Sequence, residues 1–256
     1  MKNFFNTTLL LILLGLIIFQ FRDKLFPQAP CSQPIAYNLS TFDTQFGISK
    51  DYFLSALSDA EAIWEKPFGK QFFSYIPADT SSEDLKINLV YDYRQRATAK
   101  LNSLGITVAD NQASYNELKS KYTVLKSEIT IAENNHDNVS DINAKIDEAN
   151  AMVVALNHLV GILNLSVGEY NNTNDTRGES FEEGVYISDQ SGQHIDIYEF
   201  SNRDKLVRVL AHELGHALGL EHVDDPKAIM YKLNQGNNES LTKADIDEVK
   251  TICKIK

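Results

Sequence analysis

The chain has 256 residues, of which 43% are hydrophobic and 23% charged. This is an ordinary globular composition, which excludes a disordered or collagen-like chain and allows one sizeable core. Lys and Arg number 24 against 35 Asp and Glu, so the formal net charge is −11 and the pI is near 5.0. Nucleic-acid binding depends on electrostatic attraction to phosphate, which this charge opposes, so we expect no nucleic-acid partner.

An apolar run occupies residues 4–21, with Lys2 before it and Arg22 and Lys24 after it. A helix of about 18 residues, rising about 1.5 Å per residue, just spans a hydrocarbon core of roughly 30 Å. No small-residue cleavage site follows the run, so we predict that residues 1–30 form an uncleaved single-pass membrane anchor and linker. The rest of the chain would then lie outside the cytoplasm. The alternative is a signal peptide cut near Ala29 and a secreted protein.

Two cysteines are present, Cys31 just after the apolar run and Cys253 near the other end of the sequence. In an exported chain this pair can close a disulfide that joins the two ends of the fold. Two unrelated thiols are the alternative, and the sequence does not decide between them.

The first globular segment, residues 31–95, reads in chain order as strand, helix, strand and strand. The expected strands are 35–39, 72–76 and 85–93, which are rich in aromatic and β-branched residues, and the expected helix is 50–65. Pro67 and Gly69 are expected to end that helix. This order predicts an α+β fold in which a helix packs on a mixed sheet.

The pattern changes over residues 96–175, where apolar residues recur at alternating steps of three and four from Ala97 to Ala132 and again from Val139 to Tyr170. Such a heptad pattern predicts two helices of about 35 to 40 residues that pair as a long antiparallel coiled-coil hairpin, with its turn at residues 134–138. Gly105 and Asn111 are expected to weaken the first helix. We interpret the hairpin mainly as a rigid spacer, with docking of a protein partner as the alternative.

The last segment, residues 176–256, returns to the α+β pattern. Two alternating runs, 183–188 and 193–200, predict a β-hairpin. Asn202 is expected to cap the next helix, Gly219 to end it, and Thr242 to cap a final helix. Segments 31–95 and 176–256 would therefore form one domain, interrupted by the hairpin.

The strongest chemical signal is the pattern HExxHxxGxxH in residues 212–222. His212 and His216 are four residues apart, so a helix presents both imidazoles on one face. Gly219 lets the chain turn out of the helix, which brings His222 in as a third ligand. Three protein ligands and one open position are typical of catalytic zinc, so we expect one catalytic Zn²⁺ ion.

Glu213 gives this site a chemical role, because a structural zinc site has no use for a carboxylate beside its ligands. We expect Glu213 to take a proton from a zinc-bound water as it attacks a peptide carbonyl, and to pass that proton to the leaving amine. The expected function is therefore zinc-dependent endopeptidase activity on a protein or peptide substrate. The alternative is a membrane-tethered adhesion or scaffolding protein with an inactive zinc domain and a functional coiled-coil arm.

The extended motif, followed by Met230 in the segment DPKAIMY, resembles the metzincin zinc endopeptidases and is most similar to their matrixin branch. The resemblance implies that Met230 supports the zinc ligands from below. It also implies that Gly184, Val185, Tyr186 and Ile187 form an edge strand on which a substrate peptide lies antiparallel.

One departure from the matrixin pattern concerns a second metal. Matrixins carry structural zinc and calcium in the loop that the hairpin occupies here, and only His194 and Asp196 resemble its ligands. We therefore do not expect a second structural zinc or calcium.

Overall fold

The structure, a computed structural model, describes residues 31–77, 84–106, 108, 112–163, 183–190, 192–232 and 239–255. The predicted anchor over residues 1–30 lies outside these residues. Within them, no helix has the length and apolar character needed to cross a membrane.

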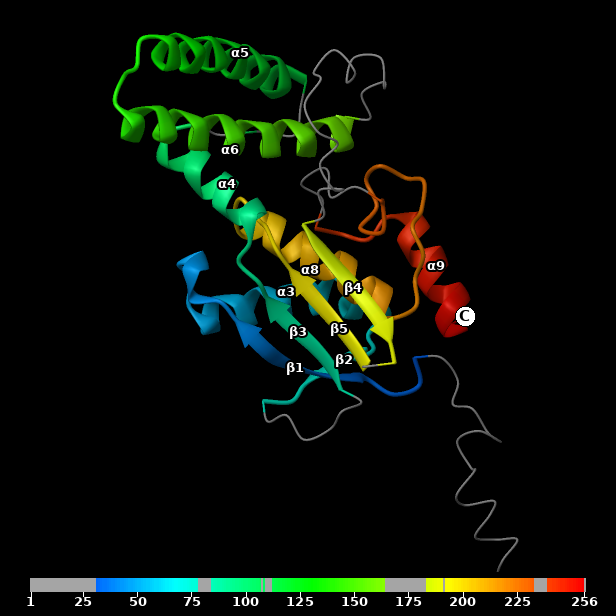
Figure 1. Cartoon of the computed structure of the whole chain (residues 1–256). Coiled ribbons are helices and arrows are strands. Elements are labelled where there is room, and N and C mark those ends of the chain that lie inside the picture. Colours follow the sequence, from blue (N-terminus) through cyan, green and yellow to red (C-terminus); the bar gives the residue numbers. More distant parts are fainter. Residues whose placement is uncertain are drawn as a thin grey trace, which may run out of the picture.

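Strands within residues 31–89 and 184–197 form a five-stranded mixed sheet, which confirms the predicted α+β class (Figure 1). Its strands are β1 (Ile35–Phe42), β2 (Phe73–Tyr75), β3 (Leu85–Leu89), β4 (Gly184–Asp189) and β5 (Gly192–Ile197), in the spatial order β2-β1-β3-β5-β4. Neighbouring strands are parallel except β4, which pairs antiparallel with β5 at the edge of the sheet. The β4–β5 hairpin closes at Gly192, whose φ of 120° suits glycine.

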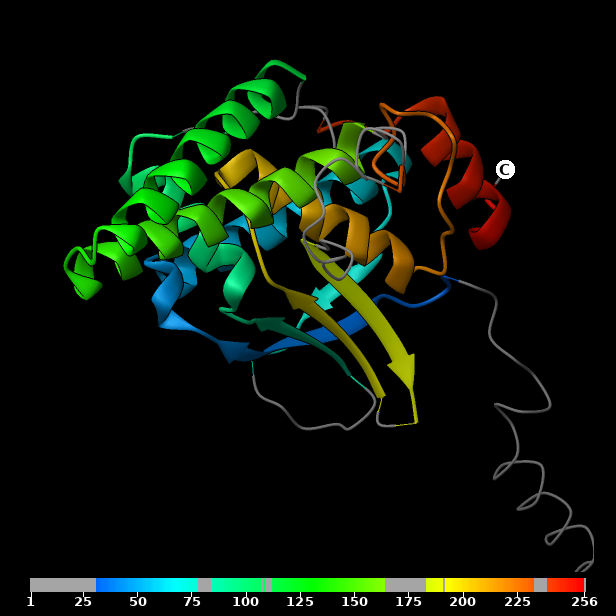
Figure 2. The same cartoon turned by 45° about the horizontal axis from the view of Figure 1, so that its top comes forward.

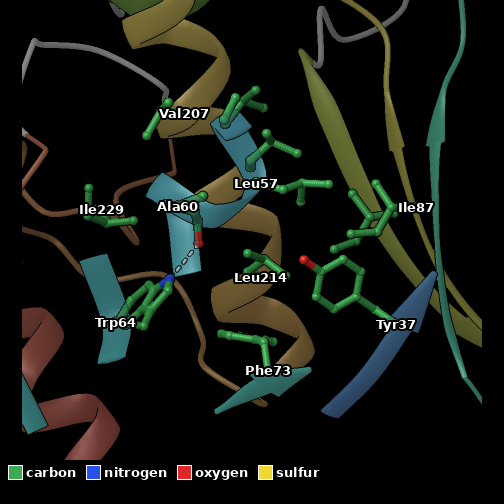
Figure 3. Close-up of a cluster of buried hydrophobic side chains, with 14 of the residues drawn as sticks. Tyr37, Leu57, Ala60, Trp64, Phe73, Ile87, Val207, Leu214 and Ile229 are labelled. Carbon is green, nitrogen blue, oxygen red and sulfur yellow. Dashed lines mark hydrogen bonds between the residues drawn. The ribbon is translucent and has the colours of Figure 1, made fainter. Parts of the chain in front are cut away.

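Alternation along the strands places the apolar residues on one face of the sheet. Ile87 in β3 pairs with Ile195 in β5, and both side chains are buried. Two helices, α3 (Lys50–Phe68) and α8 (Arg203–Ala217), cover this face and pack on each other (Figures 1 and 2). Leu57 and Leu214 lie in the core between helices and sheet, whereas Trp64 lies on the side of α8 away from the strands (Figure 3).

Helix α3 runs three residues further than predicted. Ser49 caps it by accepting a hydrogen bond from the Tyr52 amide at 3.1 Å, and it ends at Gly69, whose φ is 56°. Pro67 lies inside the last turn instead of ending the helix. At its other side, a 3₁₀ turn at Thr44–Phe46 connects β1 to the helix.

Among the described residues, the predicted hairpin has three helices rather than two, so the expectation of a continuous first helix was wrong. The end of the predicted second helix, residues 164–170, lies outside them. Helix α4 (Tyr93–Ser103) ends before Gly105, whose φ is 69°, and α5 (Gln112–Asn134) starts a separate helix. Helix α6 (Val139–Leu163) runs back along α5 and also packs on α4 (Figure 2). The heptad packing of a coiled coil stays a prediction. We call α4, α5 and α6 together the helical arm.

The arm has its own hydrophobic cluster, separate from the core under the sheet. Its most buried members include Leu101 from α4, Leu118 from α5 and Leu159 from α6.

The predicted third strand also ends earlier than expected, since β3 stops at Leu89 and α4 begins at Tyr93.

The final helix, α9 (Lys243–Cys253), begins with a capping box between Thr242 and Asp245. Its last residue, Cys253, forms a disulfide with Cys31, and the two Cα atoms are 5.2 Å apart. This bond links the start of the described chain to the helix that follows the zinc-motif region.

Candidate metal centre and active site

Helix α8 presents two of the motif histidines from one face. Asn202 caps the helix by accepting a hydrogen bond from the Lys205 amide at 3.0 Å. One turn separates His212 from His216, and their Nε2 atoms are 3.2 Å apart. The helix ends at Ala217, because Gly219 turns the chain away with a φ of 88°.

The chain then returns to the helix and brings in the third histidine. The Nε2 atom of His222 is 3.2 Å from that of His212 and 3.2 Å from that of His216. The three nitrogens therefore form an equilateral triangle. Nitrogens on a tetrahedral zinc ion, bonded at about 2.0 to 2.1 Å, are about 3.3 to 3.4 Å apart, so the donor set fits zinc.

The hydrogen bonds of the Nδ1 atoms determine which ring nitrogen carries the proton in His212 and His216. His212 donates from Nδ1 to the carbonyl oxygen of Ile229 at 2.7 Å, and His216 donates from Nδ1 to that of Leu220 at 2.9 Å. Because a carbonyl oxygen only accepts, each Nδ1 must carry the proton, which leaves the Nε2 lone pair available to a metal.

Burial favours the same neutral form. It lowers the pKa of His212 to about 3, against the opposing effect of the hydrogen bond to Ile229. Burial also lowers the pKa of His216, and the neighbouring His222 adds to that effect. Both rings are therefore uncharged at neutral pH, which is the state that binds a metal ion.

Glu213 lies beside this triad and under the edge strand. Its side chain is buried, and a β-carbon built on Gly184 would be 3.2 Å from its Cγ atom and 2.9 Å from Cγ2 of Val209. Only glycine therefore allows β4 to lie this close to α8. The first residue of the edge strand is packed directly against the carboxylate-bearing part of the helix.

Met230 packs against the helix that carries His212 and His216, at Gly215. It is fully buried, and a β-carbon on Gly215 would be 2.2 Å from its sulfur atom and 2.9 Å from the Trp64 ring. The turn that carries Met230 is also tied to the site by its backbone, since the Val223 amide donates to the Met230 carbonyl at 2.9 Å.

A buried carboxylate holds this turn in place. Asp245 accepts hydrogen bonds from the amides of Ile229 and Met230, at 3.0 and 2.9 Å, in addition to those from Thr242 in its capping box. Sequence reasoning identified Thr242 only as a helix cap and gave Asp245 no role beyond it. The long-range bonds to the turn carry no local sequence signal.

Arg208 is a second residue that sequence reasoning missed. It lies one turn before His212, is buried, and donates from Nη2 to the Ala228 carbonyl at 2.6 Å. Burial lowers its pKa, while the carboxylates of Asp245 and Glu183 oppose that change. An arginine within the apolar stripe of the active-site helix was the available signal.

His194 and Asp196 lie together on β5 and do not belong to the histidine triad. The distance from His194 Nε2 to Asp196 Oδ2 is 3.9 Å. Asp196 also accepts hydrogen bonds from Asn88 at 2.8 Å and from the Tyr198 hydroxyl at 3.1 Å. Among the described residues, the three motif histidines are the one group of three or more such side chains close enough to share a metal ion.

Comparison with protein families agrees with this geometry. A family model described as Matrixin matches residues 31–254, which is most of the chain. The chain belongs to the matrixin family. A search of curated proteins finds no match to it. Membership confirms the resemblance drawn from the motif and supports a metalloprotease in general, and it implies zinc, which the histidine set of this matrixin fits.

Proposed function

We propose that this matrixin is a zinc-dependent endopeptidase in which His212, His216 and His222 hold the metal and Glu213 is the general base. The observation that carries the proposal is the triangle of Nε2 atoms, each 3.2 Å from the others, on a chain of a metalloprotease family. Gly219 and Met230 would support the site, the first by turning the chain and the second by packing under the ligands.

The chain's own residues would divide the chemistry between them. When bound, zinc supplies Lewis-acid polarisation of a carbonyl and lowers the pKa of a water molecule. Glu213 would accept the water proton on a carboxylate oxygen and deliver it to the nitrogen of the leaving amine. The bonds from His212 to Ile229 and from His216 to Leu220 would keep the ligand rings oriented throughout.

The substrate would bind as an additional strand along β4. Residues 184–187 lie in the edge strand of the sheet, and their backbone can pair with an extended peptide. We propose that Gly184, Val185, Tyr186 and Ile187 bind the peptide in antiparallel orientation, next to Glu213. The proposed substrate is therefore an unfolded or extended segment of a protein.

The organisation and location of the chain follow from the same proposal. We propose one catalytic domain formed by residues 31–95 and 176–256, with residues 96–175 inserted; the two separate hydrophobic clusters support this division. The Cys31–Cys253 disulfide supports an extracytoplasmic location. The apolar segment before residue 30 would anchor the protein in a membrane, or would be removed on secretion.

A test compares wild type with Glu213→Ala on an unfolded protein substrate, with zinc content measured in both. We expect both to bind one zinc ion and the variant to lose activity by about a hundredfold or more. Glu133→Ala, which changes an exposed carboxylate in α5, is the matched control and should keep full activity. Equal activity of wild type and Glu213→Ala would overturn the enzyme assignment.

A second candidate is a tethered adhesion or scaffolding protein that acts through the helical arm. One observation favours it: the large apolar side chains that are exposed among the described residues all lie in or beside the arm. They are Tyr93, Leu104, Val124, Ile131 and Val139. An inactive zinc-loaded wild-type protein would support this candidate over the peptidase.

A further inference from the structure

The helical arm is joined to the catalytic part by hydrogen bonds at one end of the sheet. From α4, Gln95 Oε1 accepts from the Phe200 amide at 3.1 Å, and the Thr98 hydroxyl donates to Glu199 Oε1 at 2.9 Å. Both partners directly follow β5 and are buried. The arm therefore contacts the segment that leads from β5 of the sheet into helix α8.

A second contact comes from α6 and reaches the start of the edge strand. His158 Nε2 is 3.7 Å from Glu183 Oε1, and both side chains are largely buried. The Glu183 carbonyl accepts from the amides of Tyr198 and Glu199 at 2.9 and 3.2 Å. Helices α4 and α6 thus hold the two ends, 183 and 199, of the same β-hairpin.

Glu183 also borders the catalytic helix. The next residue, Gly184, packs against Val209 and Glu213 so closely that no β-carbon would fit. On the other side, the carboxylate of Glu183 acts on the pKa of the buried Arg208, which donates to the turn below the zinc ligands. A shift of Glu183 would move the strand at the point where it meets the proposed general base.

A cavity of about 380 Å³ lies at this junction. Leu101, Val154 and Ala155 line it from the arm, and Glu183, Glu199 and Lys205 line it from the catalytic part. The two parts therefore meet around a space instead of through continuous apolar packing. The contact of His158 with Glu183 lies at this cavity and adds to the bonds from Gln95 and Thr98 in fixing the relative position of the two sides.

The direction of the substrate shows which part of it this junction affects. A peptide added antiparallel to β4 runs from the Asp189 end toward the Gly184 end, so its C-terminal part lies beside Gly184. Figures 1 and 2 show the arm across the end of the sheet at which β4 begins. That end would carry the substrate residues that follow the scissile bond.

We propose that His158 is a positioning residue, through which α6 of the arm holds Glu183 and the first residues of β4 in place for the leaving-group side of the substrate. The arm then sets how tightly that side of the peptide is bound, while the zinc site carries out the chemistry. The substrate part of this inference rests on the proposed peptidase function. The placement of β4 by His158 does not depend on it.

The kinetic test uses the full chain with two peptides that share a scissile bond but have one or four residues after it. We expect His158→Ala to raise KM for the longer peptide by about three- to tenfold, with kcat unchanged and the shorter peptide unaffected. His158→Gln keeps a donor for Glu183 and should restore the wild-type KM. An equal effect on both peptides, an effect on kcat alone, or no effect would overturn the proposal.

Hydrogen exchange gives a readout that needs no activity. In zinc-loaded His158→Ala, amide exchange in residues 184–189 should become several times faster, while exchange in residues 35–42 of β1 stays as in wild type. The matched control is His136→Asn in the turn of the arm, where the φ of 56° is one that asparagine tolerates. Unchanged exchange in residues 184–189 of His158→Ala would overturn the role of His158. Faster exchange there, together with a zinc-loaded wild type that has no peptidase activity, would overturn only the peptidase function.

Discussion

The sulfur atom of Met230 occupies the space into which a side chain on Gly215 would project, at 2.2 Å from the position of its β-carbon. Gly215 lies in the last turn of α8, between two of the motif histidines. Glycine inside a helix costs about 1 kcal/mol relative to alanine. The close approach of the methionine explains why glycine stands there.

Gly215→Ala should therefore destabilise the protein despite its better helix propensity. We expect a loss of about 1 to 3 kcal/mol in the free energy of unfolding, as for other overpacked cores, and a lower zinc affinity. Urea unfolding and zinc titration measure both quantities. Adding Met230→Ala removes the shortest of the close approaches and leaves only that of the Trp64 ring, so Gly215→Ala should cost less in that background. Equal costs in both backgrounds would contradict this explanation.

Asp245→Asn should loosen the turn below the zinc ligands. Asp245 is fully buried and accepts from two amides of the turn, and an amide nitrogen in place of one oxygen would face donors without accepting from them. We expect a loss of about 2 to 4 kcal/mol in the free energy of unfolding, together with reduced zinc content. Asp247→Asn changes an exposed carboxylate on the same helix and should cost less than about 0.5 kcal/mol.

Removing the disulfide should lower stability without changing the zinc ligands. Cys31 and Cys253 are 222 positions apart in the sequence, so their bond removes much conformational entropy from the unfolded chain. We expect the Cys31→Ser, Cys253→Ser double variant to lose about 2 to 5 kcal/mol by thermal or urea unfolding. Reductant should lower the stability of wild type and leave the variant unchanged; sensitivity of the variant would argue against this origin of the effect.

The metal-free protein should become less stable in mild acid. Because burial lowers the pKa of His212 from 6.5 to about 3, the unfolded chain binds more protons than the folded chain between those values. Stability therefore falls as the pH decreases from about 6.5 toward about 3. His216, whose pKa is also lowered, acts in the same direction.

Urea unfolding in the presence of a chelator measures this effect. Between pH 7.5 and 4.5 we expect His212 to account for a loss of about 1 to 3 kcal/mol. His212→Asn keeps a donor for the Ile229 carbonyl but cannot be protonated in this range, so its stability should depend less on pH. The same pH dependence in wild type and variant would rule out His212 as the cause.

Local signals account for the features that the sequence predicted well. Asn202 and Thr242 cap α8 and α9 as expected, and the turn at Gly192 joins two strands close to the predicted ones. Each of these features depends on residues a few positions apart. The spacing of His212, His216 and Gly219 is local in the same sense.

Features that depend on distant residues were not predictable from one sequence. The heptad pattern around Gly105 suggested a weak point but not a complete break, because the pattern reports which residues are buried and not where the backbone changes direction. The contact of His158 with Glu183 joins segments that lie apart in the chain. The bonds from Asp245 to the turn are of the same kind.

The disulfide also determines what a cut in the arm would do. The turn between α5 and α6, at residues 135–138, is exposed and lies between the two bonded cysteines in the sequence. A protease that nicks this turn would produce two polypeptides that stay covalently joined and migrate together until reductant is added. The nicked molecule would therefore consist of two chains. The disulfide would keep residues 31–77 covalently attached to the chain that carries the zinc motif.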